Sequence, residues 1–367
     1  MSGSASCSSG SGAKAPRDGG MDASGGSHVS DGGAAGAAGS DSGADMDSDA
    51  GSDGAADADA AAGSDGVDGA ADAISDLAGD GARPSSYEVK TPTFSVALGS
   101  ETTQCVVLDL GNEQPVHVGH IKATISAPIY ELRIAAVGGG VQTTPTDCVP
   151  FGDVTDSTAR PLMFARNNIE DLSFPAGIVY TFAAHQLLRF EIHAWNPTGD
   201  ALPANASAIF SVSSDATFQH EAGLLLLEAS EVHVNPGETG TLGPEFFRIS
   251  DVLSAASIFR LEGYTHELGT EMTMSLAASA TDASPITIYA PNPWNPANPL
   301  VVDEGVPFAL GANGGIALTC AWNNTAGQNP VTRGPSVADE RCAAFVSYYP
   351  AVSAHVCVHS GAGTTCM

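Results

Sequence analysis

The chain has few basic residues for its length. Its 367 residues include 13 Lys and Arg against 42 Asp and Glu, which gives a formal net charge of −29 at pH 7. Nucleic acid and anionic membrane surfaces both repel a protein of this charge at short range. The composition therefore argues against a nucleic-acid partner and against electrostatic attachment to a lipid surface.

The first 86 residues contain no Phe, Trp or Tyr. Gly, Ala, Ser and Asp dominate this segment, so it has almost no apolar area to offset the entropy lost on ordering. We expect residues 1–86 to form a disordered acidic tail or stalk. Asp45, Asp47 and Asp49 imitate the spacing of a calcium loop, but Ala56 stands where the loop needs a bidentate Glu. We interpret that stretch as a solvated linker.

The tail also lacks the apolar segment of a signal peptide within residues 1–30. We expect the natural start to lie further upstream. Cys7, followed by a long polar spacer, is a candidate lipid-anchor cysteine, although the residues before it lack the Leu of such signals. The alternative is a single thiol in a flexible tail.

Several other signatures are missing from the whole sequence. No apolar run is long enough for a membrane-spanning helix. Neither a CxxC pair nor a Cys/His cluster at zinc spacing is present, and a GxSxG nucleophile elbow is absent. The Gly-rich run at 136–142 lacks the Lys and the following helix of a phosphate-binding loop. A zinc site, a serine hydrolase and a nucleotide are therefore not predicted.

Six of the seven cysteines lie after the tail, and an even number in a β-rich segment favours disulfides over metal binding. They are Cys105, Cys148, Cys320, Cys342, Cys357 and Cys366. Disulfides persist in oxidising compartments, so we expect an extracytoplasmic protein that is secreted, periplasmic or anchored at a surface.

From Tyr87 onward, short apolar or alternating segments are separated by Gly- and Pro-containing turns, and helical periodicity is absent. This pattern predicts an all-β fold. The length exceeds one sandwich, and turns near Gly223 and Pro236 offer a division. We predict two tandem jelly-roll-like β-sandwich domains, at 87–222 and 223–367.

Four stretches resemble the copper type II, ascorbate-dependent monooxygenases, the family of peptidylglycine α-hydroxylating and dopamine β-monooxygenases. PLMFARNNIEDLSFPAGIVYTFAAHQLLRFEIHAWNP, at 161–197, resembles the segment that ends in a copper-binding His, here His193. GYTHELGTEMTM resembles the His-x-His segment, in which His266 matches the second ligand and Tyr264 occupies the first. LTCAWNN and ADERCAAFVSYYP resemble the C-terminal cysteine pair, with Arg341 at the position of the Met ligand.

The fourth stretch, APIYELRI, lies where the family has adjacent histidines, and Ile129 and Tyr130 stand there instead. The resemblance implies copper as cofactor, ascorbate as reductant and hydroxylation of a C–H bond in an unidentified small-molecule or peptide substrate. It also implies disulfides joining Cys105 to Cys148 and Cys320 to Cys342, which leaves the last two cysteines to pair locally. Two of the six ligand positions match, so we predict a degenerate bacterial-type member with impaired or lost catalysis.

Two alternatives remain open. A single copper site could be rebuilt from His193 with other histidines, for which His117, His120 and His185 come into question. Otherwise the protein is a non-catalytic binding or surface-interaction protein that uses the cleft between its domains.

In the second alternative, Tyr264, His266, Glu267 and Arg341 are the candidates to line the cleft. Arg341 would clamp a carboxylate there. Pairing of Glu267 with Arg341 would instead fill the space that copper leaves. An Arg-bearing cleft without converging histidines would favour the binding protein.

Overall fold

The computed structural model describes residues 83–151, 158–311 and 314–367. Every described residue belongs to one compact unit, Leu77–Met367. The calcium-like stretch and Cys7 lie outside the described residues, as does the tail up to residue 82. No helix in the described part is long and apolar enough to cross a membrane.

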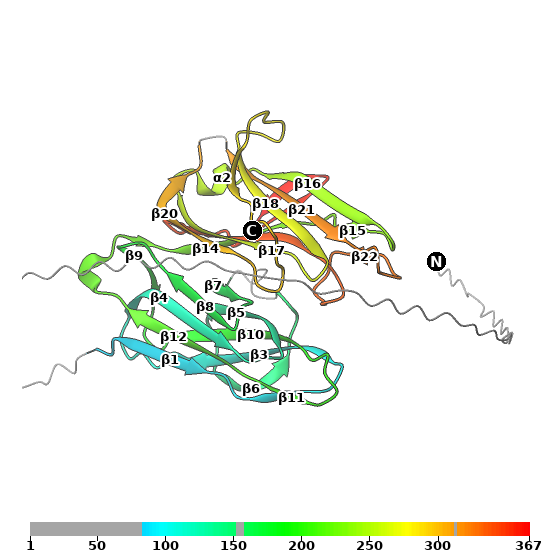
Figure 1. Cartoon of the computed structure of the whole chain (residues 1–367). Coiled ribbons are helices and arrows are strands. Elements are labelled where there is room, and N and C mark those ends of the chain that lie inside the picture. Colours follow the sequence, from blue (N-terminus) through cyan, green and yellow to red (C-terminus); the bar gives the residue numbers. More distant parts are fainter. Residues whose placement is uncertain (1–82, 152–157, 312–313) are drawn as a thin grey trace, which may run out of the picture. The chain divides into compact units, whose positions relative to one another are not determined.

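The described chain is almost entirely β-structure (Figure 1), which confirms the predicted fold class. The helical segments within it are a 3-10 turn, η1 (Asp215–Thr217), and one turn of α-helix, α2 (Ser250–Leu253). The strands form two jelly-roll-like sandwiches, each with two main sheets that are mostly antiparallel and each including a parallel strand pair.

The first sandwich uses the strands before residue 222. Its outer sheet has the order β1 (Ser86–Lys90), β12 (Ala206–Val212), β4 (Val116–Ile125), β9 (Ile178–Phe182) and β13 (His220–Glu221), with β8 (Ile169–Ser173) also paired to β4. The second sheet, called the β10 sheet below, has the order β6 (Gln142–Asp147), β3 (Glu101–Asp109), β10 (Leu187–Trp195), β5 (Ile129–Val137) and β7 (Arg160–Ala165). A small ribbon joins β2 (Phe94–Val96) and β11 (Leu202–Ala204).

The second sandwich follows the same plan. Its larger sheet, called the β23 sheet below, has the order β20 (Val301–Ala309), β17 (Ser257–Tyr264), β23 (Cys342–Tyr349), β14 (Gly223–Ala229), β24 (Val356–Ser360) and β25 (Gly363–Cys366). The facing sheet has the order β16 (Thr239–Phe247), β21 (Gly315–Asn323), β18 (Gly269–Ala277) and β19 (Ile286–Tyr289). A further ribbon joins β15 (His233–Val234) and β22 (Val331–Thr332).

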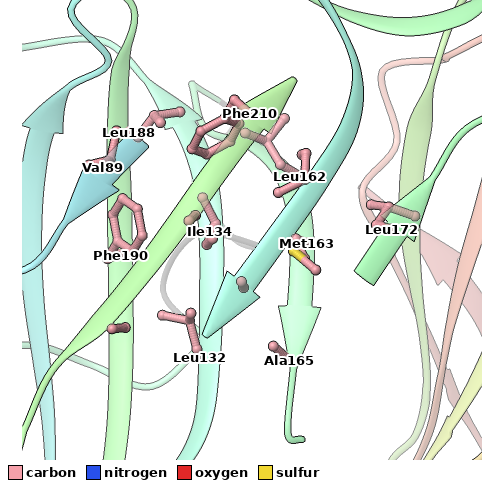
Figure 2. Packing of buried hydrophobic residues seen from close by; sticks show 14 of the residues in the cluster. Val89, Leu132, Ile134, Leu162, Met163, Ala165, Leu172, Leu188, Phe190 and Phe210 are labelled. Atoms are coloured by element: carbon pink, nitrogen blue, oxygen red, sulfur yellow. The ribbon is translucent and has the colours of Figure 1, made fainter. Parts of the chain in front are cut away.

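Alternation along the strands builds each core, because successive side chains point to opposite faces of a sheet. On β10, Leu188, Phe190 and Ile192 are fully buried in the core of the first sandwich. Figure 2 shows Phe190 beside Leu132 and Ile134 of β5, the neighbouring strand. The second core is built in the same way around residues such as Leu227 of β14 and Val346 of β23.

The β10 and β23 sheets are buried on both faces. Their second faces meet in an apolar cluster to which each sandwich contributes: Phe151 and Phe164 from the first, and Leu224, Leu226, Tyr264, Ala343, Phe345 and Val356 from the second. Charged residues lie on the same two faces and are at most 5% exposed, namely Glu131, Arg133, Glu191, Glu228, Arg260 and Glu262. This double burial explains why β14, GLLLLEA, reads as a nearly continuous apolar run in the sequence.

The three predicted disulfides are confirmed: Cys105–Cys148, Cys320–Cys342 and Cys357–Cys366. The Cys320–Cys342 bond joins β21 to β23 and so ties together the two sheets of the second sandwich. The Cys357–Cys366 bond links directly opposed residues of β24 and β25.

Candidate functional site

The predicted ligand positions converge only in part. His193 lies on β10 beside β5, and a register irregularity directly after it leaves Tyr130 between the residues paired with His193 and Ala194. The Tyr130 ring meets both histidines edge-on, with centroid distances of 6.0 Å to His193 and 5.7 Å to His266. Ile129 instead joins the core of the first sandwich. Tyr130 therefore lies between the two surviving histidines.

His193 is 4% exposed and is held by residues of β3. Its Nδ1 lies 2.8 Å from Thr103 Oγ1. Its Nε2 is 2.9 Å from Glu101 Oε1, close enough for an ion pair but not aligned for a hydrogen bond. The same Glu101 accepts hydrogen bonds from Ser336 Oγ and Val337 N of the second sandwich.

Tyr130 is packed against Arg166 as well as the two histidines. The Arg166 guanidinium carbon lies 4.3 Å from the centre of its ring, a cation–π contact. The buried hydroxyl has no hydrogen-bond partner among the described residues. Burial raises the pKa of Tyr130 above its usual value, against the lowering effect of Arg166, so the phenol stays neutral.

A hydrogen-bonded chain runs from the second sandwich to the first through Tyr264. Its hydroxyl donates to Glu131 Oε2 on β5 and lies 2.8 Å from His266 Nε2. His266 Nδ1 is 2.9 Å from the Asp339 carbonyl oxygen, which can only accept, so Nδ1 carries a proton. His266 Nδ1 therefore donates within the protein, and the Tyr264 hydroxyl lies directly in front of Nε2.

The electrostatics of this chain follow from its burial. Burial raises the pKa of Tyr264 well above its ordinary value. Burial is also the main cause that lowers the pKa of His266 to about 4, and the positive charges of Arg166 and Arg341 act in the same direction, against the raising effect of Glu131. Burial would raise the pKa of Glu131, but His193, the Tyr264 hydrogen bond and other nearby charges lower it overall. Glu131 is therefore ionised and His266 neutral at pH 7.

Glu340 fixes the loop that carries His266. Its Oε1 accepts from Leu268 N, and its Oε2 accepts from His266 N, Trp322 Nε1 and Arg341 N. Burial raises the pKa of Glu340 to about 7, although these four donors favour the ionised form. The loop geometry thus depends on a fully buried carboxyl group immediately before Arg341.

Arg341 pairs with Glu228 of β14, not with Glu267. Its Nη1 lies 2.8 Å from Glu228 Oε1, while Arg333 Nη2 lies 2.6 Å from Glu228 Oε2. Glu267 is exposed, so its expected pairing with Arg341 is wrong. The reason lies in the register: Glu228 opposes Ala343 across β14 and β23, two residues beyond Arg341, on the same face of the sheet.

A pocket of about 370 Å³ opens beside Arg341. Its lining comes from both sandwiches and comprises Val149, Pro150, Phe151, Glu228, Arg333, Gly334, Pro335, Arg341, Val356, Val358 and Met367. Of the four cleft candidates, only Arg341 lines it. Tyr264 and His266 are buried, at 0% and 1% exposure. The pocket bears arginines and no histidine.

The other histidines do not approach His193. His117 and His120 lie on β4 in the opposite sheet of the first sandwich, where His117 contacts Thr181 Oγ1 at 3.1 Å and His120 contacts Asp171 Oδ1 at 2.7 Å. His185 has a positive φ of 55° in the turn before β10 and is exposed. A site rebuilt from these residues has no geometric support.

The donor set does not fit copper. Within the described residues, no group of three or more His, Cys, Asp or Glu side chains is arranged to hold a metal ion. A metal at His266 Nε2 would have to displace the Tyr264 hydroxyl, and His193 offers only itself and Glu101. Arg341 adds a permanent positive charge that cannot ligate.

Sequence reasoning missed Glu131, Glu228 and Glu340, the acceptors around which these contacts are organised. Two of them did leave a signal, because each interrupts an otherwise apolar strand: YELRIAAV contains Glu131, and GLLLLEA contains Glu228. An ionisable residue in such a run is rarely buried without a partner. Glu340 left no comparable mark, because it stands in a polar loop.

The fold and the site define an all-β protein of two sandwiches with a buried polar network where they meet. Residues 247–366 match the family model described as the C-terminal domain of copper type II ascorbate-dependent monooxygenases. The C-terminal part of the chain is therefore similar to that domain, and the matched span includes His266 and Arg341. A search of the curated proteins gives no match.

The solved structures that the chain matches include proteins of viruses. The major capsid protein P2 of bacteriophage PM2 is 11% identical over 72% of this chain and 96% of its own, with a TM-score of 0.31. A chain from cowpea mosaic virus is 11% identical over 69% of this chain and 89% of its own, with a TM-score of 0.25. A chain from the Sulfolobus turreted icosahedral virus is 6% identical over 71% of this chain and 58% of its own, with a TM-score of 0.22.

Proposed function

We propose that this protein is an exported relative of the copper type II ascorbate-dependent monooxygenases that no longer carries out two-copper hydroxylation. It acts instead as a binding protein through the cleft between its two sandwich domains, 87–222 and 223–367. The three disulfides support an oxidising compartment.

One observation carries the proposal: the positions that bind copper in the family hold buried side chains that contact one another. Tyr264, at the first position of the His-x-His pair, engages Glu131 and His266 together. Tyr130 fills the space between the two histidines. A hydroxylating site needs an open coordination position for oxygen beside one copper, and among the described residues Tyr264 and Tyr130 take up the space next to His266.

The position of Arg341 supports the same conclusion. Two unit charges 4 Å apart repel by about 4 kcal/mol at an effective dielectric of 20, and Cu(II) carries two. Within this network, Arg341 is a guanidinium at 5% exposure where the family has a thioether. Its charge is balanced by Glu228 and opposes metal binding nearby.

Copper stoichiometry of the full chain tests the proposal. The protein is loaded with Cu(II), dialysed and examined by metal analysis and electron paramagnetic resonance. The matched comparison is the quadruple variant I129H/Y130H/Y264H/R341M, which restores the family's ligand types. We expect less than one tightly held copper in the natural protein and no ascorbate-dependent oxygen uptake.

Two coppers per natural chain, with oxygen consumption coupled to ascorbate, would refute the proposal. One copper with a nitrogen-rich spectrum would favour the alternative, an enzyme with a single rebuilt site. The described residues give that alternative no geometric support, because His117, His120 and His185 lie away from His193.

A further inference from the structure

The pocket beside Arg341 combines cationic donors with an apolar wall. Arg341 and Arg333 reach it from one side, and both bind the same carboxylate, Glu228. The three side chains together carry one net positive charge. Val356 and Val358 of β24 supply aliphatic surface on the same wall. A volume of about 370 Å³ lies within the range of small-molecule sites.

The two guanidinium groups keep donors available for a ligand. Arg341 uses Nε for the Gly334 carbonyl and Nη1 for Glu228, while Arg333 uses Nη2 for Glu228. Within the described chain, Arg341 Nη2 and Arg333 Nε and Nη1 have no hydrogen-bond partner. Planar guanidinium groups match the geometry of a carboxylate and can bind it with two parallel hydrogen bonds.

Phe151 brings an aromatic ring to the same pocket from the first sandwich. The Arg341 guanidinium carbon lies 3.6 Å from its ring centre and that of Arg133 lies 4.1 Å away. Its backbone has a positive φ of 61° and its N–H donates to Glu191 Oε1. Such a conformation is unfavourable for Phe, so these contacts hold the ring in place at the pocket.

We propose that this pocket binds a small organic monocarboxylate with an apolar body, the carboxylate meeting Arg333 and Arg341 and the apolar part lying against Phe151 and Val356. The inference rests on the proposed binding role and names its ligand class. A dianion such as phosphate is disfavoured, because Glu228 already neutralises half of the arginine charge and the wall beyond it is apolar.

Isothermal titration of the full chain with phenylacetate tests the inference, with phenylacetamide as the neutral probe of the same shape. We expect saturable binding of phenylacetate at one site and binding of phenylacetamide at least about tenfold weaker, since a charge-assisted hydrogen bond is lost. Inorganic phosphate should not compete.

Two variants locate the site. Arg333→Gln should weaken phenylacetate binding about tenfold, because the carboxylate loses a charged hydrogen-bond donor. The Arg333 side chain is 38% exposed, so its replacement leaves the buried contacts in place. The matched control is Arg248→Gln, which changes an exposed arginine elsewhere in the second sandwich and should leave the affinity unchanged. Circular dichroism of both variants checks that they are folded.

Equal affinity for phenylacetate and phenylacetamide would overturn the inference. So would an Arg333→Gln variant that binds as well as the parent, or no binding at millimolar phenylacetate. Copper analysis of the same preparation separates the two proposals. A protein that holds neither copper nor carboxylate refutes this ligand class alone, whereas two bound coppers refute the proposed function.

Discussion

Replacing Glu228 by Gln should destabilise the protein strongly, because two arginines depend on this one carboxylate. Glu228 and Arg341 have side-chain exposures of 4% and 6%, and their atoms are 2.8 Å apart. Removing one partner of a buried pair costs about 3–5 kcal/mol, since the remaining charge is left buried and uncompensated. Arg333, at 38% exposure, can turn to water and should add little.

The assay is equilibrium denaturation of the full chain, followed by circular dichroism and tryptophan fluorescence. A loss of about 3–5 kcal/mol corresponds to a fall in Tm of roughly 10 °C for a folded region of this size. The matched control is Glu88→Gln, which breaks an exposed pair with Lys90 at 3.0 Å and should change stability by less than about 0.5 kcal/mol.

A double variant separates the charge effect from a general loss of packing. Adding Arg341→Met to Glu228→Gln removes both buried charges, and an apolar replacement of a buried pair is often neutral or stabilising. We expect the double variant to recover most of the lost stability. If Glu228→Gln behaves like Glu88→Gln, or if the double variant is less stable than the single one, the reasoning about the buried pair is wrong.

Three further outcomes are expected. Replacing Cys320 and Cys342 by Ala should cost about 3 kcal/mol, since the bond closes a loop of 22 residues, measurable by urea unfolding against the parent. Burial raises the pKa of Glu262 well above its ordinary value, so the stability linked to its protonation is present below about pH 4.5 and lost as pH rises through the folded pKa. Glu262→Gln should therefore stabilise the protein at pH 8 but not at pH 4. Thermal melts in which the variant gains the same stability over the parent at both pH values would contradict this. Tyr264→Phe leaves the ionised Glu131 carboxylate without its Tyr264 donor and removes the hydroxyl beside His266 Nε2, so it should cost more than Tyr289→Phe, which leaves the neutral Leu300 carbonyl without its donor; equal losses on denaturation would contradict it.

The all-β fold could be predicted because its signals are local. Alternation and turn residues are properties of short segments, so β10 and β17 could be recognised without knowledge of their neighbours. The disulfide pairing came from family resemblance, since cysteine spacing alone allows many connectivities. The structure confirms both predictions.

The site was harder to predict because its contacts join strands that are distant in sequence. Glu228 meets Arg341 across 113 residues and Tyr264 meets Glu131 across 133. Neither pairing follows from composition, because it depends on the register of β14 against β23 and on how the two sandwiches pack. Glu267 was the nearest acid to the His266 motif in sequence, but its side chain points to solvent.

The charges of the polar network also bear on copper. Three acids, Glu131, Glu228 and Glu340, accompany three arginines, Arg166, Arg333 and Arg341, and all but Arg333 are at most 6% exposed. The net charge of these six side chains is zero when all are ionised. Burial raises the pKa of Glu340 to about 7, so at pH 7 this carboxyl group is partly protonated and the net charge of the set is positive. A divalent cation placed here would face guanidinium groups in a medium of low dielectric. Changing Arg341 alone to Met would remove one positive charge. The Tyr264 hydroxyl would still contact His266 Nε2, and the Tyr130 ring would still lie between the two histidines. Recovery of copper binding should therefore require the tyrosines to be replaced together with the arginine.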